Sequence, residues 1–264
     1  YSIILILSVF YLDRTWIAGG TLTTINAYPF SVSVLHAPTL VTYWQYCGGT
    51  IINNRSVLSA GHCFYQRGVN QYRIRYGSTY ANSGGTVNTV SQIIINILYN
   101  PWSLDNDIAI LRSGSNIVFM PNLVAAAGIS GYNVADNVPL VAIGWGRYTG
   151  ALSEQLRQVQ IWSINQAICR TRYASVGWTI SDNMICAGWL DVGTRGQCAQ
   201  DEGSPLIQNY NTVVGIYAFS YQCGHYWYPA VNTRVSRYVT WIQNLKNFAR
   251  DSWGKNKAEY SAGF

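Results

Sequence analysis

Short runs in which apolar and polar residues alternate follow one another along most of the chain. They are rich in Val, Ile, Tyr and Thr, residue types that favour a pleated, half-buried backbone. Clusters of Gly, Asn and Ser separate them at 82–85, 113–116 and 128–133, as turns require. We therefore predict β-strands at residues 28–35, 71–76, 90–97, 108–111, 138–143, 156–161, 184–187, 213–219 and 231–235.

Convincing helical periodicity occurs in one place, near the C-terminus, where Val239, Ile242, Leu245 and Phe248 recur at helical spacing. It is almost absent between the strand-like runs. The pattern therefore predicts an all-β barrel or sandwich with a C-terminal helix. A soft boundary near 122–135 divides the chain into two similar halves.

Composition supports a folded domain with a sizeable core. Only 11% of the 264 residues are charged, while 20 Tyr and 10 Trp supply apolar surface that can offset the chain entropy lost on folding. The formal net charge is +6, but the basic residues are dispersed. Dispersed charge argues against a nucleic-acid partner. Much of the polarity comes from uncharged side chains, which suits an extracellular surface.

The cysteines and the N-terminal segment point to secretion. Six Cys without a C-x-x-C pair, and only three His, predict no metal site; an even Cys count favours three disulfides, with fifteen pairings open. Residues 2–10 form an apolar run of signal-peptide length, too short to cross a bilayer as a helix. We interpret 1–12 as a signal-peptide remnant, with a buried first strand as the alternative. No stable membrane anchor is expected.

Three separated strings contain residues suited to nucleophilic catalysis. Residues 58–63 place His62 beside a cysteine, 105–111 place an acid at the head of a strand, and 196–206 form a tight loop. A general base needs an acid to hold its tautomer and a nucleophile within reach, and none of these must be close in sequence. Each string alone is a weak signal. The three in this order are a strong one.

The strings belong to a longer series of motifs: Ile17-Ala18-Gly19-Gly20, Cys47-Gly48-Gly49-Thr50, Ser59-Ala60-Gly61-His62-Cys63, Asp107-Ile108-Ala109-Ile110-Leu111, Gly144-Trp145-Gly146, Met184-Ile185-Cys186-Ala187-Gly188 and Trp241-Ile242. With them the chain resembles the trypsin/chymotrypsin-like serine peptidases, most closely the digestive trypsin-like proteins of insects, from about Ile17 to Asn244. The resemblance implies two perpendicular six-stranded antiparallel β-barrels, with the site in the crevice between them and a C-terminal helix.

The resemblance also implies boundaries and disulfides. Residues 13–16 become a short pro-segment, 17–243 the trypsin-like domain with halves at about 17–127 and 128–243, and 244–264 the end of the helix and the tail. The implied pairings are Cys47–Cys63, Cys169–Cys186 and Cys198–Cys223. In the chain-entropy model each disulfide raises the free energy of unfolding by roughly 3 kcal/mol.

By resemblance, His62 takes the general-base position and Asp107 the orienting-acid position, whereas the competing Asp105 is interpreted as a turn residue. The family's Gly-Asp-Ser-Gly-Gly-Pro is here Gln200-Asp201-Glu202-Gly203-Ser204-Pro205, so Glu202 stands at the nucleophile position. A carboxylate has no proton for the base to remove, and its attack on an amide gives a high-energy mixed anhydride. Ser204 lies beyond the sharp turn that aims the nucleophile.

The resemblance implies further departures around the cleft. The oxyanion-hole amides would come from Gln200, where the family has Gly, and from Glu202. The specificity-pocket walls align with Gly196, Ser220 and Ala230, so the pocket base lacks the acid that selects Arg or Lys. Tyr221 and Gln222 narrow its mouth.

Activation is altered as well. In the family, a new Ile ammonium pairs with the aspartate before the nucleophile, here Ile17 and Asp201. Trp16 precedes Ile17, however, and the nearest basic residue, Arg14, is two positions too early. Either an aromatic-preferring peptidase cuts after Trp16 or the chain stays zymogen-like. The alternative to the ion pair is that Asp201 simply hydrogen-bonds locally.

The remnant site poses an electrostatic question. With one imidazole between two carboxylates, we predict a raised pKa for His62 and a Glu202–His62 salt bridge. The alternative is that Glu202 points to solvent. The cluster at 225–228 (His-Tyr-Trp-Tyr) is either a binding surface or packing over the loop closed by Cys198 and Cys223.

These observations favour a secreted trypsin-like serine protease homologue that lacks the nucleophile and acts by binding. Its partners would be peptides, protease inhibitors or other proteins of the secretion; no cofactor, metal or nucleic acid is expected, and the oligomeric state is open. One alternative is a serine endopeptidase with weak or unorthodox activity. Another is a structural or storage protein of a secretion.

Overall fold

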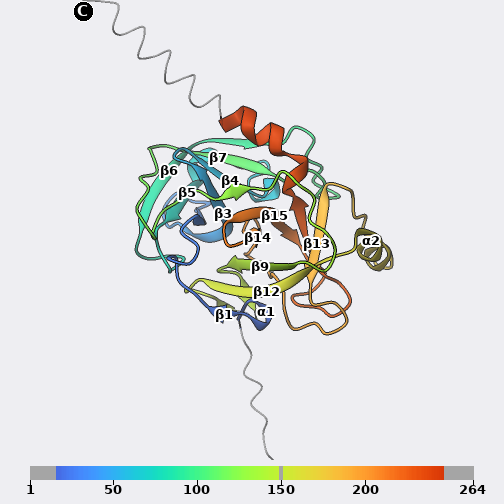
Figure 1. Ribbon diagram of the computed structural model, residues 1–264. Helices are drawn as coiled ribbons and strands as arrows, with labels where there is room; N and C mark the ends of the chain where they lie inside the picture. Colours follow the sequence, from blue (N-terminus) through green and yellow to red (C-terminus); the bar gives the residue numbers. More distant parts are fainter. Residues whose placement is uncertain (1–15, 149–150, 247–264) are drawn as a thin grey trace, which may run out of the picture.

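The computed structural model describes residues 16–148 and 151–246 (Figure 1). Residues 1–12, interpreted above as a signal-peptide remnant, most of the predicted pro-segment and the tail from residue 247, including Phe248 of the helical pattern, lie outside the described residues. Within them, no helix is long and apolar enough to cross a membrane.

Six antiparallel strands close into a first barrel, in the order β2-β3-β4-β7-β6-β5 and back to β2. Buried and half-buried residues alternate in Tyr72–Tyr76, as in a strand with one side in the barrel core, whereas Ser56–Ser59 and Ala109–Ser113 are buried throughout. The strands are β2 (Ser31–His36), β3 (Trp44–Asn53), β4 (Ser56–Ser59), β5 (Tyr72–Tyr76), β6 (Thr86–Ile95) and β7 (Ala109–Ser113).

A second set of six antiparallel strands closes in the order β9-β12-β13-β16-β15-β14 and back to β9. These are β9 (Pro139–Gly144), β12 (Arg157–Ile164), β13 (Met184–Gly188), β14 (Pro205–Gln208), β15 (Thr212–Phe219) and β16 (Ala230–Arg234). Short strands flank them: β1 (Thr21–Leu22) on β12, β8 (Gly128–Ile129) parallel to β15, and the pair β10 (Arg147–Tyr148) and β11 (Ala151–Leu152). The two-barrel prediction is confirmed.

The helices are few. The C-terminal helix occupies 239–246, as the spacing of its apolar residues predicts, and buries Ile242 in the first core cluster. The others are α1 (Trp16–Gly19), α2 (Gln166–Ala174) and the 3₁₀ turns η1 (Gly61–Cys63), η2 (Val69–Gln71) and η3 (Val235–Arg237). Helix α2 was not predicted. Its signal is the cap: the Asn165 side chain accepts the N–H groups of Ala167 and Ile168 at 3.0 and 3.2 Å.

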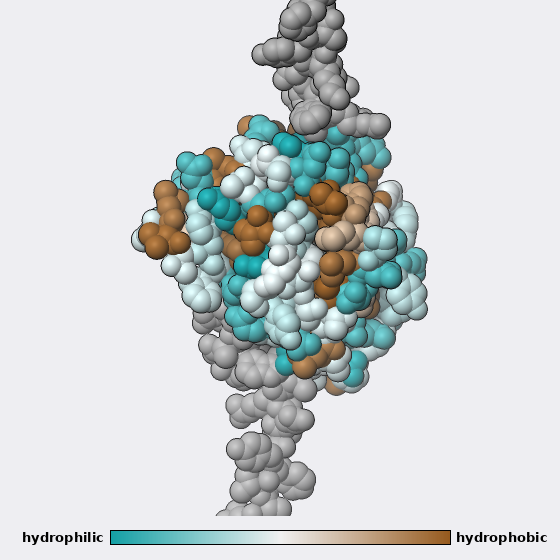
Figure 2. Space-filling model, turned by 90° about the vertical axis from the view of Figure 1, so that its left-hand side faces the viewer, coloured by the Kyte–Doolittle hydropathy of each residue, from teal (hydrophilic) through white to brown (hydrophobic). Residues whose placement is uncertain are grey.

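All three expected disulfides are present: Cys47–Cys63, Cys169–Cys186 and Cys198–Cys223. The first joins β3 to η1, and the third closes the loop that carries the candidate nucleophile position. On the face shown in Figure 2, hydrophobic residues form small separate patches among polar and neutral ones. Such scattered patches are normal for a folded soluble surface.

Candidate active site

His62 and Asp107 are brought together by the pairing of β4 with β7. In the pairing of β4 with β7, Ser59 lies opposite Ala109. His62, a few residues after Ser59, and Asp107, two residues before Ala109, therefore lie at the same end of the barrel. The His62 ring Nδ1 lies 2.7 Å from Asp107 Oδ2, and the His62 backbone N–H donates to Asp107 Oδ1 at 2.7 Å. Asp107 is fully buried, while 22% of the His62 side chain is exposed. This is the geometry of an oriented general base.

Asp105 has a different environment, as expected for a turn residue. Its carboxylate accepts hydrogen bonds from Ser181 Oγ at 2.5 Å and from Asn183 Nδ2 at 3.1 Å. Asp105 therefore ties the first half of the chain to the second, away from the imidazole.

The pKa of His62 is raised, as predicted. Burial acts to lower it, but the charge of Asp107, the hydrogen bond to Asp107 and the charge of Glu202 together outweigh burial.

These contributions rank two substitutions. Asp107→Asn is expected to lower the His62 pKa more than Glu202→Gln, because Asp107 acts through both its charge and a hydrogen bond. Titration of the His62 ring by NMR measures both shifts, and the partly buried ring of His225, outside this site, serves as the internal control. A His62 pKa that stays the same in Glu202→Gln would show that the Glu202 charge does not act on the ring.

Residues 201–204 form a tight turn. The Ser204 N–H donates to the Asp201 carbonyl at 2.8 Å, and Gly203 has φ +82° at the third position, where a type II turn requires glycine. The Gly48 N–H of β3 donates to the Glu202 carbonyl at 2.7 Å, so the first barrel holds the tip of the turn. Ser204 is 2% exposed and lies against Gly48, which excludes it as a substitute nucleophile.

The Glu202 carboxylate bends back onto its own loop. Its Oε2 accepts the Gln200 N–H at 2.5 Å, and its own N–H contributes a further hydrogen bond. Burial raises the pKa of Glu202 in spite of these bonds. The predicted direct ion pair with His62 is therefore wrong: in the described chain the imidazole pairs with Asp107, and Glu202 acts on it through space. The carboxylate does not simply point to solvent either.

Gln200 occupies the left-handed region, with φ +72°. A residue with a side chain is strained there, which is the outcome expected where the family has glycine. The buried Gln45 of β3 stabilises the conformation by donating its Nε2–H to the Gln200 carbonyl at 2.7 Å. Both amides expected at the oxyanion position thus lie in the same strained loop.

Asp201 is fully buried, and its carboxylate accepts the N–H groups of Gly146 at 2.7 Å and Cys198 at 2.9 Å. The chain continues through Trp16 and Ile17 in α1, so Ile17 has no free ammonium here, and its side chain lies outside the described residues. The Ile17–Asp201 ion pair stays a prediction for a chain cut after Trp16. Burial raises the pKa of Asp201 to about 7.

This buried acid should make stability depend on pH. From pH 4 to 7 the unfolded state has released the Asp201 proton while the folded state keeps it, so the unfolding free energy falls as pH rises, by roughly 4 kcal/mol over the interval. Asp201→Asn, which stays neutral, should remove that part of the slope in urea unfolding of the uncut protein. Asp182→Asn, at an exposed ion pair with Arg170, is the matched control and should leave the slope intact. Equal slopes in all three proteins would contradict the expectation.

One of the positions expected at the specificity pocket, Ser220, contacts a residue that was not predicted, Tyr217. Gly196 and Ala230 are buried, and the Gly196 N–H donates to the Ala18 carbonyl at 3.1 Å. Tyr217 of β15 is fully buried, and its hydroxyl lies 2.8 Å from Ser220 Oγ, at the pocket wall. The alternating pattern of the sequence correctly predicts that Tyr217 lies in a strand, but it does not show which group the phenol hydroxyl contacts. Gln197, next to Gly196, is also fully buried.

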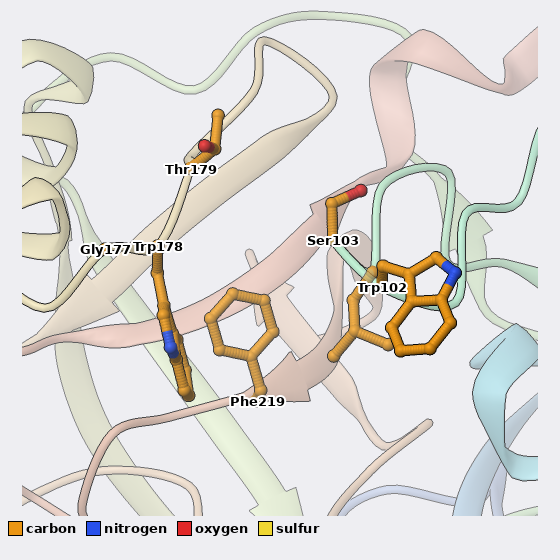
Figure 3. Close-up of a pocket in the computed structure, with 7 residues that line it drawn as sticks. Trp102, Ser103, Gly177, Trp178, Thr179 and Phe219 are labelled. Atoms are coloured by element: carbon orange, nitrogen blue, oxygen red, sulfur yellow. The ribbon is translucent and has the colours of Figure 1, made fainter.

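An open aromatic slot lies at Phe219, two residues after Tyr217 in β15. Figure 3 shows Phe219 between Trp178 on one side and Trp102 on the other. The cavity has a volume of about 300 Å³, and Trp178 packs edge-on against Phe219 with ring centroids 5.1 Å apart. Trp102 is 95% exposed. The slot can take an apolar or aromatic group.

Of the two interpretations of the cluster at 225–228, packing has contacts in the structure, while binding stays a prediction. His225 Nδ1 accepts the N–H groups of Trp227 and Tyr228, and the Tyr228 ring lies 4.7 Å from the ring of Tyr221, which belongs to the loop closed by Cys198 and Cys223. Tyr226 and Trp227 remain partly exposed, and Arg172 lies over the Trp227 ring at 4.1 Å.

The architecture is chymotrypsin-like: it has two β-barrels, an oriented Asp–His pair and three disulfides at the expected positions. Comparison with known proteins gives the family: the model described as Trypsin matches residues 17–242, and the chain belongs to this family. It is 51% identical over 232 residues to "Trypsin, alkaline C" of Manduca sexta and 53% identical over 231 residues to "Trypsin CFT-1" of Choristoneura fumiferana, with 86% of this chain and 90% of each relative covered. It is 46% identical over 236 residues to "Achelase-1" of Lonomia achelous, covering 86% of this chain and 99% of that protein.

Proposed function

We propose that this protein is a catalytically silent member of the trypsin family, which binds peptides or proteins without cleaving them. The observation that carries the proposal is Glu202. It stands at the tip of the turn where the family carries its nucleophile, and its carboxylate is held by the Gln200 N–H.

The chemistry of the remaining groups supports this function. His62 and Asp107 keep the geometry of a base and its orienting acid, but a base is useful only if the nucleophile has a proton to give. Glu202 has none when ionised, and its negative charge would repel the oxyanion that forms during acyl transfer.

The aromatic slot supplies the binding site in this proposal. Exposed Trp and neighbouring Phe rings provide large contact areas at low cost in side-chain entropy, as is typical of interface anchors. An extended peptide or the exposed loop of a protease inhibitor could place an apolar side chain in the slot that Trp102, Trp178 and Phe219 line. We further infer that the protein is secreted, because three disulfides persist in an oxidising compartment.

The test uses the purified natural protein and its His62→Ala variant. We expect no covalent label from a fluorophosphonate probe, and no turnover above that of His62→Ala on peptides with aromatic or aliphatic residues before the scissile bond. Binding is measured by titration with purified protein inhibitors of serine proteases, and Trp178→Ala should weaken it.

The second candidate is a weak serine endopeptidase. It is favoured by the intact His62–Asp107 pair and by relatives of about 50% identity that are named trypsins. Peptide hydrolysis by the natural protein that disappears in His62→Ala would establish it and overturn the binding proposal. Absence of both hydrolysis and inhibitor binding would also contradict the binding proposal.

A further inference from the structure

Tyr217 lies directly against the loop that carries Glu202. The Tyr217 carbonyl accepts the Gly203 N–H at 2.8 Å, and the Tyr217 N–H donates to the Ser204 carbonyl at 3.0 Å. The strand register shifts between Tyr217 and Phe219 in the pairing of β15 with β16, which locally re-aims the side chains. The backbone of Tyr217 is therefore fixed on the side of the turn where Glu202 sits.

The phenol of Tyr217 extends from this backbone to the wall of the specificity pocket. Its hydroxyl lies 2.8 Å from Ser220 Oγ, and the residue is fully buried. Its pKa is raised well above the ordinary value by burial first and then by the negative charge of Glu202. A buried ring that reaches from the Glu202 loop to the wall residue Ser220 occupies space that a bound side chain would need.

The Glu202 carboxylate lies next to this pocket, at the expected oxyanion position. Its carboxylate takes the Gln200 N–H, one of the two amides expected to receive a substrate's oxyanion. An aromatic ring in the side-chain pocket and a carboxylate on these amides are the two groups that the acid product of cleavage after an aromatic residue would present.

We propose that Tyr217 and Glu202 together close the primary specificity pocket from within, as a built-in mimic of an aromatic carboxylic acid. This goes beyond the lost nucleophile: the pocket is already occupied, so a partner docks without inserting a side chain there. The open aromatic slot is left as the part of the cleft that can accept one.

The test empties the pocket and refills it. The double variant Tyr217→Ala/Glu202→Ala should bind 3-(4-hydroxyphenyl)propanoate in a saturable, one-to-one manner by calorimetry, at least tenfold more tightly than p-cresol, which lacks the carboxylate. In the natural protein only the aromatic slot is open, so it should show no preference for the acid over p-cresol. Tyr72→Ala is the matched control: Tyr72 is fully buried in the first barrel, with its hydroxyl on the Cys63 carbonyl, so its cavity should show no preference for the acid.

A natural protein that binds the acid at least tenfold more tightly than p-cresol overturns the proposal, as does a folded double variant that binds neither compound or shows no preference for the acid. If circular dichroism shows that the double variant is unfolded, the single variant Glu202→Ala tests whether the Glu202 carboxylate mimics that of a bound acid. This variant retains the Tyr217 ring, and formate should raise its unfolding temperature but not that of the natural protein. No such rise overturns the proposal. Neither result depends on whether the protein binds inhibitors.

Discussion

Glu202→Ser is expected to give the protein a reactivity toward fluorophosphonates that the natural chain lacks. The variant restores a hydroxyl at the tip of the 201–204 turn, and His62, already oriented by Asp107, can accept its proton. Removal of the nucleophile from an unrelated serine protease lowers turnover by about 10⁶-fold, so even a partly aligned hydroxyl should raise the labelling rate by roughly 10³-fold or more. Mass spectrometry of the labelled peptide checks the site.

The control for this variant is Glu202→Ser/His62→Ala, which should lose the gained labelling. Peptide hydrolysis by Glu202→Ser should remain slow, because Gln200 is strained and Tyr217 still fills the pocket. A folded Glu202→Ser protein that is labelled no faster than the natural one would mean that the missing hydroxyl is not the main defect.

The largest loss of stability is expected from Gly203→Ala. Gly203 has φ +82°, and a Cβ there would collide with the Ser59 hydroxyl and the Gly48 carbonyl. The left-handed backbone costs about 1–2 kcal/mol for alanine, and overpacking adds about 1–3 kcal/mol. For a domain of this size the sum lowers the unfolding temperature by about 10 °C, measured by calorimetry.

Gly177→Ala separates the two causes. Gly177 has φ +75°, but no atom lies within 4 Å of a Cβ added there. The free energy of unfolding of this variant should therefore fall only by the cost of the left-handed backbone, about 1–2 kcal/mol. Equal losses in the two variants would show that the contact between the turn and the first barrel contributes little.

Much of the fold could be predicted from the sequence, because β-strands leave a local trace. Strands at 72–76 and 184–188 end within a residue of the predicted ranges. Strand β4 was missed, since its four residues are all buried and show no alternation. Helix α2 was missed for a similar reason: only two of its residues are buried, so it carries almost no apolar periodicity.

The site was predictable as a set of positions but not as a set of contacts. Motif order identified His62, Asp107 and Glu202, and the raised His62 pKa followed from charge alone. The direction in which the Glu202 carboxylate turns depends on a backbone N–H of Gln200, a group that every residue but proline has. Where the Tyr217 ring ends depends likewise on the register shift in β15, which no local pattern records.

The slot between Trp102 and Trp178 also gives the molecule an optical reporter. Trp102 is almost wholly in water and Trp178 is 41% exposed, so their indole emission responds to the polarity around them. A segment seated between the two rings would exclude water and shift that emission to shorter wavelength. Docking can therefore be followed in the unlabelled protein by steady-state fluorescence, with Trp102→Phe to assign the signal.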